Sequence, residues 1–128
     1  RIGSVHPQTD VGAREVRGKN LASGLPVTLN VTSGDVRDAI GDVMEQILDC
    51  IRAVLEKTPP ELCADIYDRG ILLTGGGASL RGLPILLSQI TGIRVTVADR
   101  PMQTCALGLG RFVEHPERYP YLTQYKAR

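Results

Sequence analysis

A run of consecutive glycines is the part of this 128-residue sequence whose residue types best suit the binding of a ligand. It follows an apolar segment, residues 70–74, with the unbroken hydrophobic pattern of a strand covered on both faces, and it precedes a helical pattern. A strand that turns into a helix places backbone N–H groups at the helix N-terminus, where the helix dipole favours an anion. Glycines let a phosphate or a nucleoside approach that backbone, because they have no Cβ atom. The candidate binding residues are Gly75, Gly76, Gly77, Ala78 and Ser79.

The glycine run by itself leaves two interpretations open. A tight turn that needs a positive φ angle uses the same residues as a nucleotide contact does. The run is neither a Walker A loop, since it lacks the Gly-Lys-Ser/Thr ending, nor a G-x-G-x-x-G fingerprint. The glycines alone therefore favour neither interpretation.

Composition and charge limit the class of protein under both interpretations. Hydrophobic residues at 42% and charged residues at 23% are typical of a globular protein with one core, or of one piece of a larger domain. A net charge of +1 gives no electrostatic case for binding nucleic acid. No apolar run approaches the length of a membrane span, and no signal peptide is recognisable. Because the sequence begins with Arg1, we expect a fragment or a processed product.

The cysteines and histidines do not predict a metal site. Cys50, Cys63 and Cys105 are widely spaced, and each lies within an apolar helical pattern. This placement predicts reduced core residues of a cytosolic protein. His6 and His115 lie far from the cysteines in sequence. Neither a metal ligand nor a catalytic residue is therefore predicted in this chain.

The first half of the chain predicts a hairpin followed by a long helix. Residues 15–17 and 27–31 favour extended conformations, with turn chemistry between them. Thr32 or Ser33 can cap a helix, and Asp35 stands at capping-box spacing from Thr32. Apolar residues then recur every three or four positions to Leu55, which predicts an amphipathic helix packed on a core with a solvated acidic face. The prolines of residues 58–60 end that helix.

The second half alternates helices with strands. We predict a short helix at 61–67, the strand at 70–74, a helix at 80–90 that Gly82 and Pro84 interrupt, and a strand at 94–98. A last helix is predicted from Pro101 to Val113. Gly108 and Gly110 in this helix, and Gly41 in the long helix, would allow a neighbouring element to pack closely. This order predicts an α/β layer with a mostly parallel sheet, whose ligands bind at the carboxyl ends of strands. The tail carries Tyr119, Tyr121 and Tyr125 and is either a docking segment or a frayed terminus.

Several separated blocks resemble the C-terminal part of the MreB/Mbl family, the bacterial actin-like rod-shape proteins. They are LEKTPPEL at 55–62, DRGILLTGGGASLRGL at 68–83, TGI at 91–93, Pro101, and TCALGLGR at 104–111. The upstream hairpin, with SGLP at 23–26 and Thr32-Ser33 before the helix, is similar to the same family. The resemblance covers residues 1–114, and the tail after Glu114 departs from it.

The resemblance implies an α/β chain with the actin/Hsp70/sugar-kinase (ribonuclease H-like) fold, in which two lobes close on a nucleotide. This chain is then a fragment of one lobe. Residues 1–32 belong to a small β-rich upper subdomain that takes part in protofilament contacts. Residues 33–114 form the α/β lower subdomain with the glycine-rich nucleotide contact, and residues 115–128 form a C-terminal tail.

The resemblance also implies a function. MreB-like proteins bind ATP, with Mg in the full-length protein, and polymerise into filaments beneath the membrane that organise cell-wall synthesis and rod shape. The glycine segment, Gly75 to Ser79, then contacts the adenosine and the phosphates. Implied partners are further copies of the protein, the membrane adaptor RodZ, the cell-wall elongation machinery, and the membrane through a missing N-terminal part. We expect a cytoplasmic protein at the inner face of the membrane, and ATP hydrolysis by the full-length protein but not by this fragment.

Other classes remain alternatives. A sugar or acetate kinase of the same superfamily would use a similar glycine turn, but the sequence shows no identifiable substrate-binding aspartate. An Hsp70-like lobe would need a substrate-binding domain downstream. The fragment could also be a non-catalytic interaction module, because the lower subdomain of MreB-like proteins is where RodZ docks.

Overall fold

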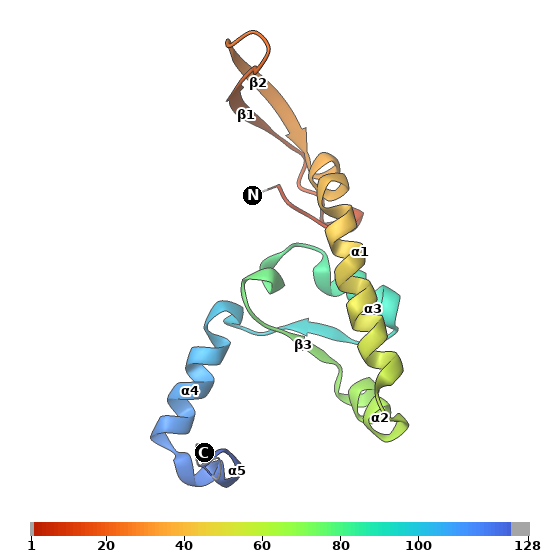
Figure 1. The fold of residues 1–128 in the computed structure, drawn as a ribbon, viewed down its shortest axis with the longest axis vertical. Coiled ribbons are helices and arrows are strands. Elements are labelled where there is room, and N and C mark those ends of the chain that lie inside the picture. Colours follow the sequence, from red (N-terminus) through yellow and green to blue (C-terminus); the bar gives the residue numbers. More distant parts are fainter. Residues whose placement is uncertain (1, 124–128) are drawn as a thin grey trace.

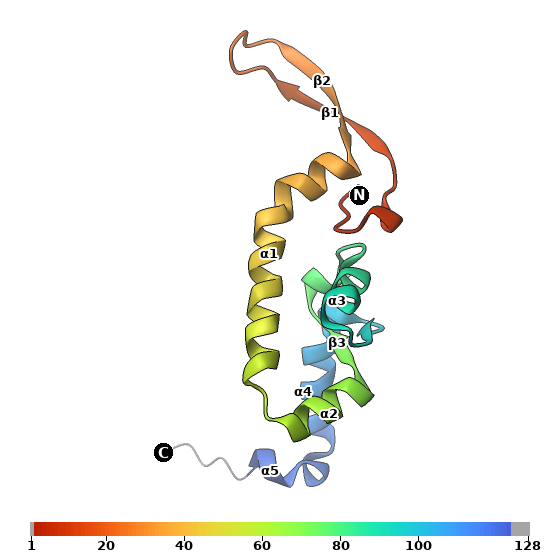
Figure 2. The same cartoon turned by 90° about the vertical axis from the view of Figure 1, so that its right-hand side faces the viewer.

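The computed structural model describes residues 2–123 and is elongated, with a hairpin at one end and a helical arm at the other (Figure 1). Between these ends lies a small body in which a long helix flanks a parallel pair of strands. Figure 2 shows this long helix running alongside the body. The body positions the glycine segment.

The hairpin pairs β1 (Ala13–Lys19) with β2 (Pro26–Thr32) in antiparallel register, Val16 opposite Leu29. The connecting turn is held by its own polar groups. Asn20 Oδ1 accepts hydrogen bonds from two backbone N–H groups of the turn, and Gly24 has a φ angle of +73°. The predicted hairpin is confirmed.

The predicted capping box starts the long helix, α1 (Ser33–Lys57). The Thr32 hydroxyl accepts a hydrogen bond from the Asp35 N–H at 3.1 Å, and the Asp35 carboxylate accepts one from the Thr32 N–H at 2.8 Å. Two N–H groups that the helix cannot satisfy itself are thereby paired. The helix ends before the proline pair, and α2 (Pro60–Arg69) follows at once.

The cap makes helix stability dependent on pH. Hydrogen bonds from the backbone and then the side chain of Thr32 lower the pKa of Asp35 from its ordinary 3.8. A lowered folded-state pKa adds stability that is fully present above the unfolded value and is lost as pH falls through the folded value. We therefore expect Asp35→Asn to reduce stability at neutral pH, and the difference from wild type to shrink as pH falls below 3.8. Urea unfolding of wild type and Asp35→Asn, from neutral pH to below pH 3.8, measures the difference in their free energies of unfolding. A difference that does not change with pH would contradict the role of the Asp35 carboxylate in the cap.

The core lies between α1, a parallel strand pair and α3 (Leu83–Thr91). The strands are β3 (Ile71–Leu73) and β4 (Val95–Val97), paired in parallel as predicted. The buried cluster contains Leu48, Leu87 and Val95. Further side chains pack against it from α1, β3 and α3: Ile51, Ile71, Leu73, Leu83, Leu86 and Ile90.

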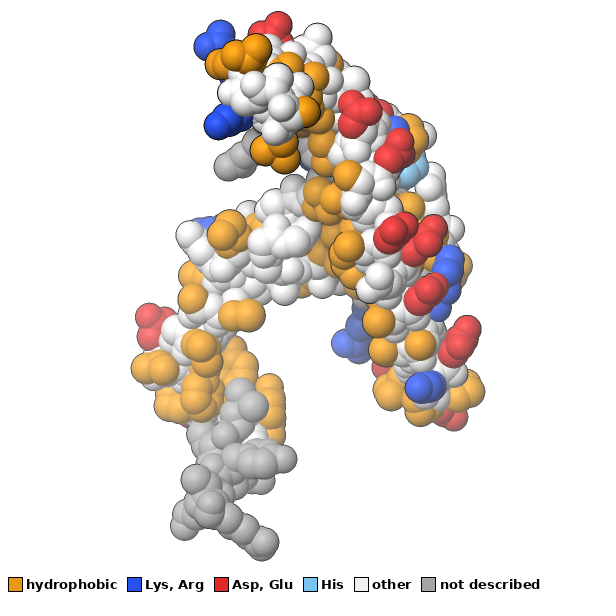
Figure 3. Space-filling view, turned by 45° about the horizontal axis from the view of Figure 1, so that its top comes forward, with side chains coloured by type: hydrophobic (Ala, Val, Ile, Leu, Met, Phe, Trp, Pro, Cys, Tyr) orange, Lys and Arg blue, Asp and Glu red, His pale blue; other side chains and the backbone are white. Residues whose placement is uncertain are grey.

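Several burial predictions are wrong. Leu72 is 60% exposed, so β3 is not covered on both faces, and Val54 of α1 is 66% exposed. Within residues 2–123, two short strands offer α1 and α3 too little surface to bury every apolar position. Cys50 and Cys105 are exposed and Cys63 is half-buried, so the cysteines are free but are not core residues. The acidic face of α1 is solvated as predicted (Figure 3).

The N-terminal segment packs on the loop before α3. Ser4 and Val5 are buried, the Val5 N–H donates to the Arg81 carbonyl at 2.9 Å, and His6 Nε2 bonds Gln89 Oε1 at 3.1 Å. The assignment of residues 1–32 to a separate subdomain stays a prediction, although residues 4–6 contact the 33–114 part.

The helix predicted to start at Leu80 starts three residues later, at Leu83. Gly82 is not an interruption of that helix but its N-cap, with φ +79°, and Pro84 occupies the first turn, where a missing N–H costs nothing. A Cβ atom at Gly82 would lie 2.6 Å from His6 Cβ, so the packed N-terminal segment also requires glycine there. Gly92 ends α3 as predicted, with φ +70°.

The chain then forms a helical arm. The helix predicted from Pro101 starts at Thr104, because a 3₁₀ turn (Pro101–Gln103) comes first. This helix, α4 (Thr104–Glu114), ends within one residue of the predicted Val113, and another 3₁₀ turn (Pro116–Arg118) and the short α5 (Pro120–Thr123) follow. The ring of Tyr119 makes edge contacts with Phe112 and Tyr121, and Tyr125 lies outside the described residues. Hydrophobic side chains cover much of the arm (Figure 3). Within residues 2–123, no helix has the length and apolarity needed to cross a bilayer.

The predicted close approach at helical glycines is not found among residues 2–123. A Cβ atom at Gly41, Gly108 or Gly110 would meet no atom within 4 Å. These glycines therefore lie on surfaces that the described residues leave open.

Candidate functional site

The glycine segment follows β3 at the carboxyl edge of the parallel strand pair. Gly75 has a φ angle of +80°, and its N–H donates to the Pro101 carbonyl at 2.7 Å. A 3₁₀ turn (Gly76–Ser79) comes next, and Leu80 closes it by donating to the Gly77 carbonyl at 3.0 Å. The sequence predicts that the glycines lead directly into an α-helix, but in the structure they lead into a tight 3₁₀ turn.

The glycines differ in what the fold requires of them. Gly75 needs its positive φ angle, so the turn interpretation holds at this position. Gly76 and Gly77 have ordinary φ angles, and a Cβ atom at either would meet no atom within 4 Å. The fold therefore does not explain their lack of a side chain, and it leaves the backbone there open to a molecule from outside.

Ala78 and Ser79 face opposite environments. Ala78 is buried, with 6% of its surface exposed, so it anchors the turn and can offer a ligand only its backbone. Ser79 is exposed and lines a hollow of about 260 Å³ beside the turn. Its side chain therefore offers a hydroxyl group to a ligand in this hollow.

The loop after β4 completes that hollow. Val97 pairs with Leu73, and the Ala98 N–H donates to the Leu73 carbonyl at 3.0 Å, so both strands end side by side. The Gly75–Pro101 hydrogen bond then fixes the second loop against the glycine segment. The far wall of the hollow consists of Arg100, Pro101, Met102 and Gln103.

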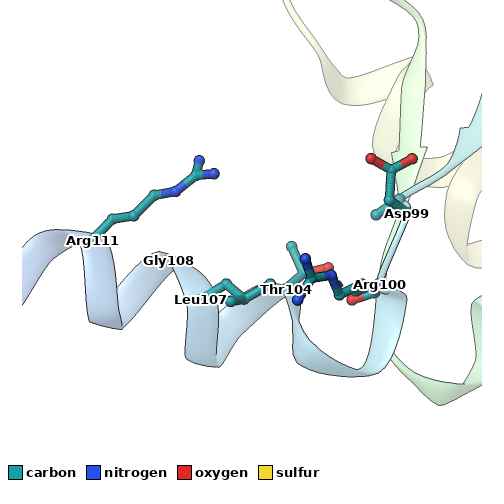
Figure 4. Close-up of a pocket in the computed structure, with 7 residues that line it drawn as sticks. Asp99, Arg100, Thr104, Leu107, Gly108 and Arg111 are labelled. Carbon is teal, nitrogen blue, oxygen red and sulfur yellow. Dashed lines mark hydrogen bonds between the residues drawn. The ribbon is translucent and has the colours of Figure 1, made fainter.

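A second hollow, of about 350 Å³, adjoins the first along α4 (Figure 4). In Figure 4 the Arg111 side chain extends from α4 into the space that Asp99 faces from the end of β4. Thr104 and Leu107 line it one helical turn apart, and Gly108 leaves its floor open. Ala98 and Arg100 complete the lining.

Sequence reasoning missed this second loop and the α4 face. A usable signal existed, since Asp99 and Arg100 directly follow a strand, and positions 104, 108 and 111 share one helical face. Neither feature of the sequence shows that the loop after β4 lies beside the glycines, because the pairing of β3 with β4 brings the two together.

The residues that line the two hollows include hydrogen-bond donors. Ser79 and Thr104 carry hydroxyl groups, and Arg100 and Arg111 carry guanidinium groups, beside the Asp99 carboxylate. Such donors suit phosphate oxygens. The lining residues do not include a histidine or a cysteine that could act as a base or a nucleophile.

Comparison with known proteins gives consistent results. The family model described as MreB/Mbl protein matches residues 1–120. The cell shape-determining protein Mbl of Bacillus cereus is 40% identical over 120 residues, which are 94% of this chain and 36% of the relative. The cell shape-determining protein MreB of Escherichia coli is 43% identical over 113 residues, 88% of this chain and 33% of the relative.

Solved structures give the same result. MreB 5 of Spiroplasma citri bound to AMPPNP superimposes with a TM-score of 0.84 at 26% identity, over 95% of this chain and 37% of that protein. The same protein bound to ADP gives a TM-score of 0.83 over 92% of this chain. The predicted fold class is thereby confirmed as part of one lobe of the actin-like fold. This chain, which spans between 33% and 37% of the length of these relatives, belongs to the MreB/Mbl family.

Proposed function

We propose that this chain is part of an ATP-binding, filament-forming bacterial actin homologue that organises cell-wall synthesis and maintains rod cell shape. The observation that carries the proposal is the match to the MreB/Mbl family over residues 1–120. The relatives named as cell shape-determining proteins support the role in shape, and the AMPPNP- and ADP-bound MreB 5 structures support nucleotide binding. The same comparisons favour this function over a sugar kinase, an acetate kinase or an Hsp70-like lobe.

The nucleotide contacts the glycine segment, Gly75 to Ser79, in this proposal. The open backbone at Gly76 and Gly77 and the exposed Ser79 hydroxyl support it. The hollow on this face is open, whereas small-molecule sites bury most of their ligand, so in this proposal it forms only one wall of the site. We therefore expect strong binding and ATP hydrolysis only in the whole protein. Within residues 2–123, His, Cys, Asp and Glu side chains form no cluster that could hold a metal, and we assign no Mg²⁺ ligand to this chain.

Filaments need surfaces that other chains can contact. The hairpin projects from the body, and Leu21 at its tip is 96% exposed (Figure 1). A contact from one end of a subunit to the opposite end of the next is the kind that extends without closing. In this proposal the protein acts in the cytoplasm at the inner face of the membrane, with RodZ-like adaptors and the cell-wall elongation machinery as partners.

Sedimentation of the whole protein tests the proposal. We expect it to pellet with lipid vesicles when ATP is present and to stay in solution when ATP is left out, with filaments in electron micrographs of the pellet. A protein that stays unpolymerised under both conditions and transfers phosphate to a sugar or an acid would contradict the proposal and support the kinase alternative.

A further inference from the structure

Arg100 is a charged residue that lines the hollow beside Ser79, and sequence reasoning did not identify it. It lines both hollows, the one shared with Ser79 and the one along α4. Among the residues that the structure describes, no other lines both hollows. A cation at this position can reach an anion in either space.

Hydrogen bonds fix the backbone at the carbonyl groups of Arg100 and of the residue after it. Its carbonyl accepts hydrogen bonds from the Gln103 N–H at 2.9 Å and the Thr104 hydroxyl at 3.0 Å. The next residue, Pro101, accepts the Gly75 N–H at 2.7 Å. The side chain therefore starts from a point held against the glycine segment.

The guanidinium group of Arg100 has no bonding partner among the described residues. It makes no hydrogen bond and no ion pair with any of residues 2–123, and the adjacent Asp99 carboxylate does not pair with it. It is exposed, and Figure 4 shows it at the start of α4, beside Thr104. An arginine has five N–H donors in a planar fork that matches phosphate oxygens.

We propose that Arg100 binds a phosphate group of the nucleotide that lies on the glycine segment, and so contributes to affinity for nucleotides over nucleosides. This inference rests on the proposed function, since it assumes that a nucleotide occupies Gly75 to Ser79. It adds a residue outside that segment, and it assigns a cationic contact to a site otherwise built from backbone N–H groups and a hydroxyl. Arg111, on the far side of the α4 hollow, does not border Ser79.

Nucleotide titration of the whole protein tests the role of Arg100. Fluorescent ADP is titrated into wild type, Arg100→Gln and Arg118→Gln at protein concentrations below filament formation, and unlabelled adenosine is then used as a competitor. Arg118 is a matched control, because it is exposed, its side chain pairs with no described residue, and it lies beyond the far end of α4. We expect Arg100→Gln to weaken ADP binding about tenfold, the size of a lost charge-assisted hydrogen bond, and Arg118→Gln to leave it unchanged.

Two further readouts separate a phosphate contact from a structural effect. Adenosine has no phosphate, so its affinity should be equal in wild type and Arg100→Gln. The ADP difference should shrink at high ionic strength, because salt screens an exposed charge. Arg100→Glu, which reverses the charge, should bind ADP more weakly than Arg100→Gln.

The outcomes distinguish failure of the Arg100 inference from failure of the proposed nucleotide-binding function. If wild type binds ADP and Arg100→Gln binds it equally well, the role of Arg100 is wrong and the nucleotide site stands. If Arg100→Gln loses adenosine and ADP to the same extent, Arg100 shapes the loop and does not bind phosphate. If wild type binds neither ligand, the proposed function itself fails.

Discussion

Gly70→Ala is expected to destabilise the whole protein by about 3 kcal/mol, because an alanine at this position meets both strain and a steric clash. Gly70 joins α2 to β3 with φ +82° and ψ −176°, a backbone region that is essentially restricted to glycine. A Cβ atom there would lie 2.6 Å from the Arg94 carbonyl oxygen. That oxygen accepts the Ile71 N–H at 2.8 Å, so moving it also weakens the first bond between β3 and β4. The free energy of unfolding, from urea denaturation, measures the effect.

Gly92→Ala is the matched control for this substitution. Gly92 also has a positive φ angle, +70°, but a Cβ atom there would meet no atom within 4 Å. The backbone conformation alone should cost about 1 kcal/mol. Equal losses for the two variants would show that the strand junction relaxes around the added methyl group, and that the clash at Arg94 contributes nothing.

The elements that sequence predicts well are those whose signals are local. The start of α1 depends on Thr32 and Asp35, three residues apart, and its end on a proline pair. The hairpin and the αL cap at Gly92 also depend on adjacent residues. Such signals act through hydrogen bonds and φ angles within one turn, so no knowledge of the remaining fold is needed.

The start of α3 shows where local reasoning fails. The apolar pattern continues from Leu80 without a break, yet the helix begins at Leu83. Gly82 adopts the αL conformation next to His6 and Thr9, which lie more than seventy positions away in sequence. A glycine two positions before a proline is a helix-start signal that favours the observed boundary. The packing of the N-terminal segment, in contrast, could not be read from local residues.

The sequence predicts more burial for the apolar residues of α1 than the structure shows, again because the packing partner is not encoded locally. Periodicity identifies which residues share a face, but it does not identify what covers that face. Val43, Ile47 and Val54 follow the predicted spacing and are exposed, whereas Met44 and Leu48, one position further along, are buried. The apolar face of α1 is thus wider than the surface that β3, β4 and α3 offer it. We propose that other parts of the whole protein cover the remainder.

One part of the candidate site could be predicted from local sequence, and the other part could not. The glycine segment could be found from sequence because its residue types are unusual and consecutive. The wall formed by Arg100 to Gln103 could not, because a pairing between strands 24 positions apart brings it there, with Ile71 opposite Val95. The role of the glycine segment in binding stays a prediction, and it has a direct test.

Gly77→Val is expected to lower the affinity of the whole protein for ADP and AMPPNP by more than about tenfold, with a change in folding stability below about 1 kcal/mol. The physical reason is the contrast between Gly77 and the glycines that the fold requires. Gly77 has an ordinary φ angle, and open space lies where its Cβ atom would be. A valine therefore fits the turn, but its methyl groups occupy the space through which a nucleotide would reach the backbone. Fluorescent ADP titration and thermal unfolding measure the two quantities separately.

Gly18→Val provides the control for the same change of side chain. Gly18 lies in β1 of the hairpin, has an ordinary φ angle, and also has no atom within 4 Å of a built Cβ atom. Valine suits a strand, and this position is remote from the glycine segment, so nucleotide affinity should equal that of wild type. If Gly77→Val binds ADP as wild type does, the nucleotide does not contact Gly77, and the glycine run serves only the turn at Gly75. If Gly77→Val loses affinity while Gly18→Val keeps it, and both unfold at the temperature of wild type, close approach to the glycine backbone is the cause.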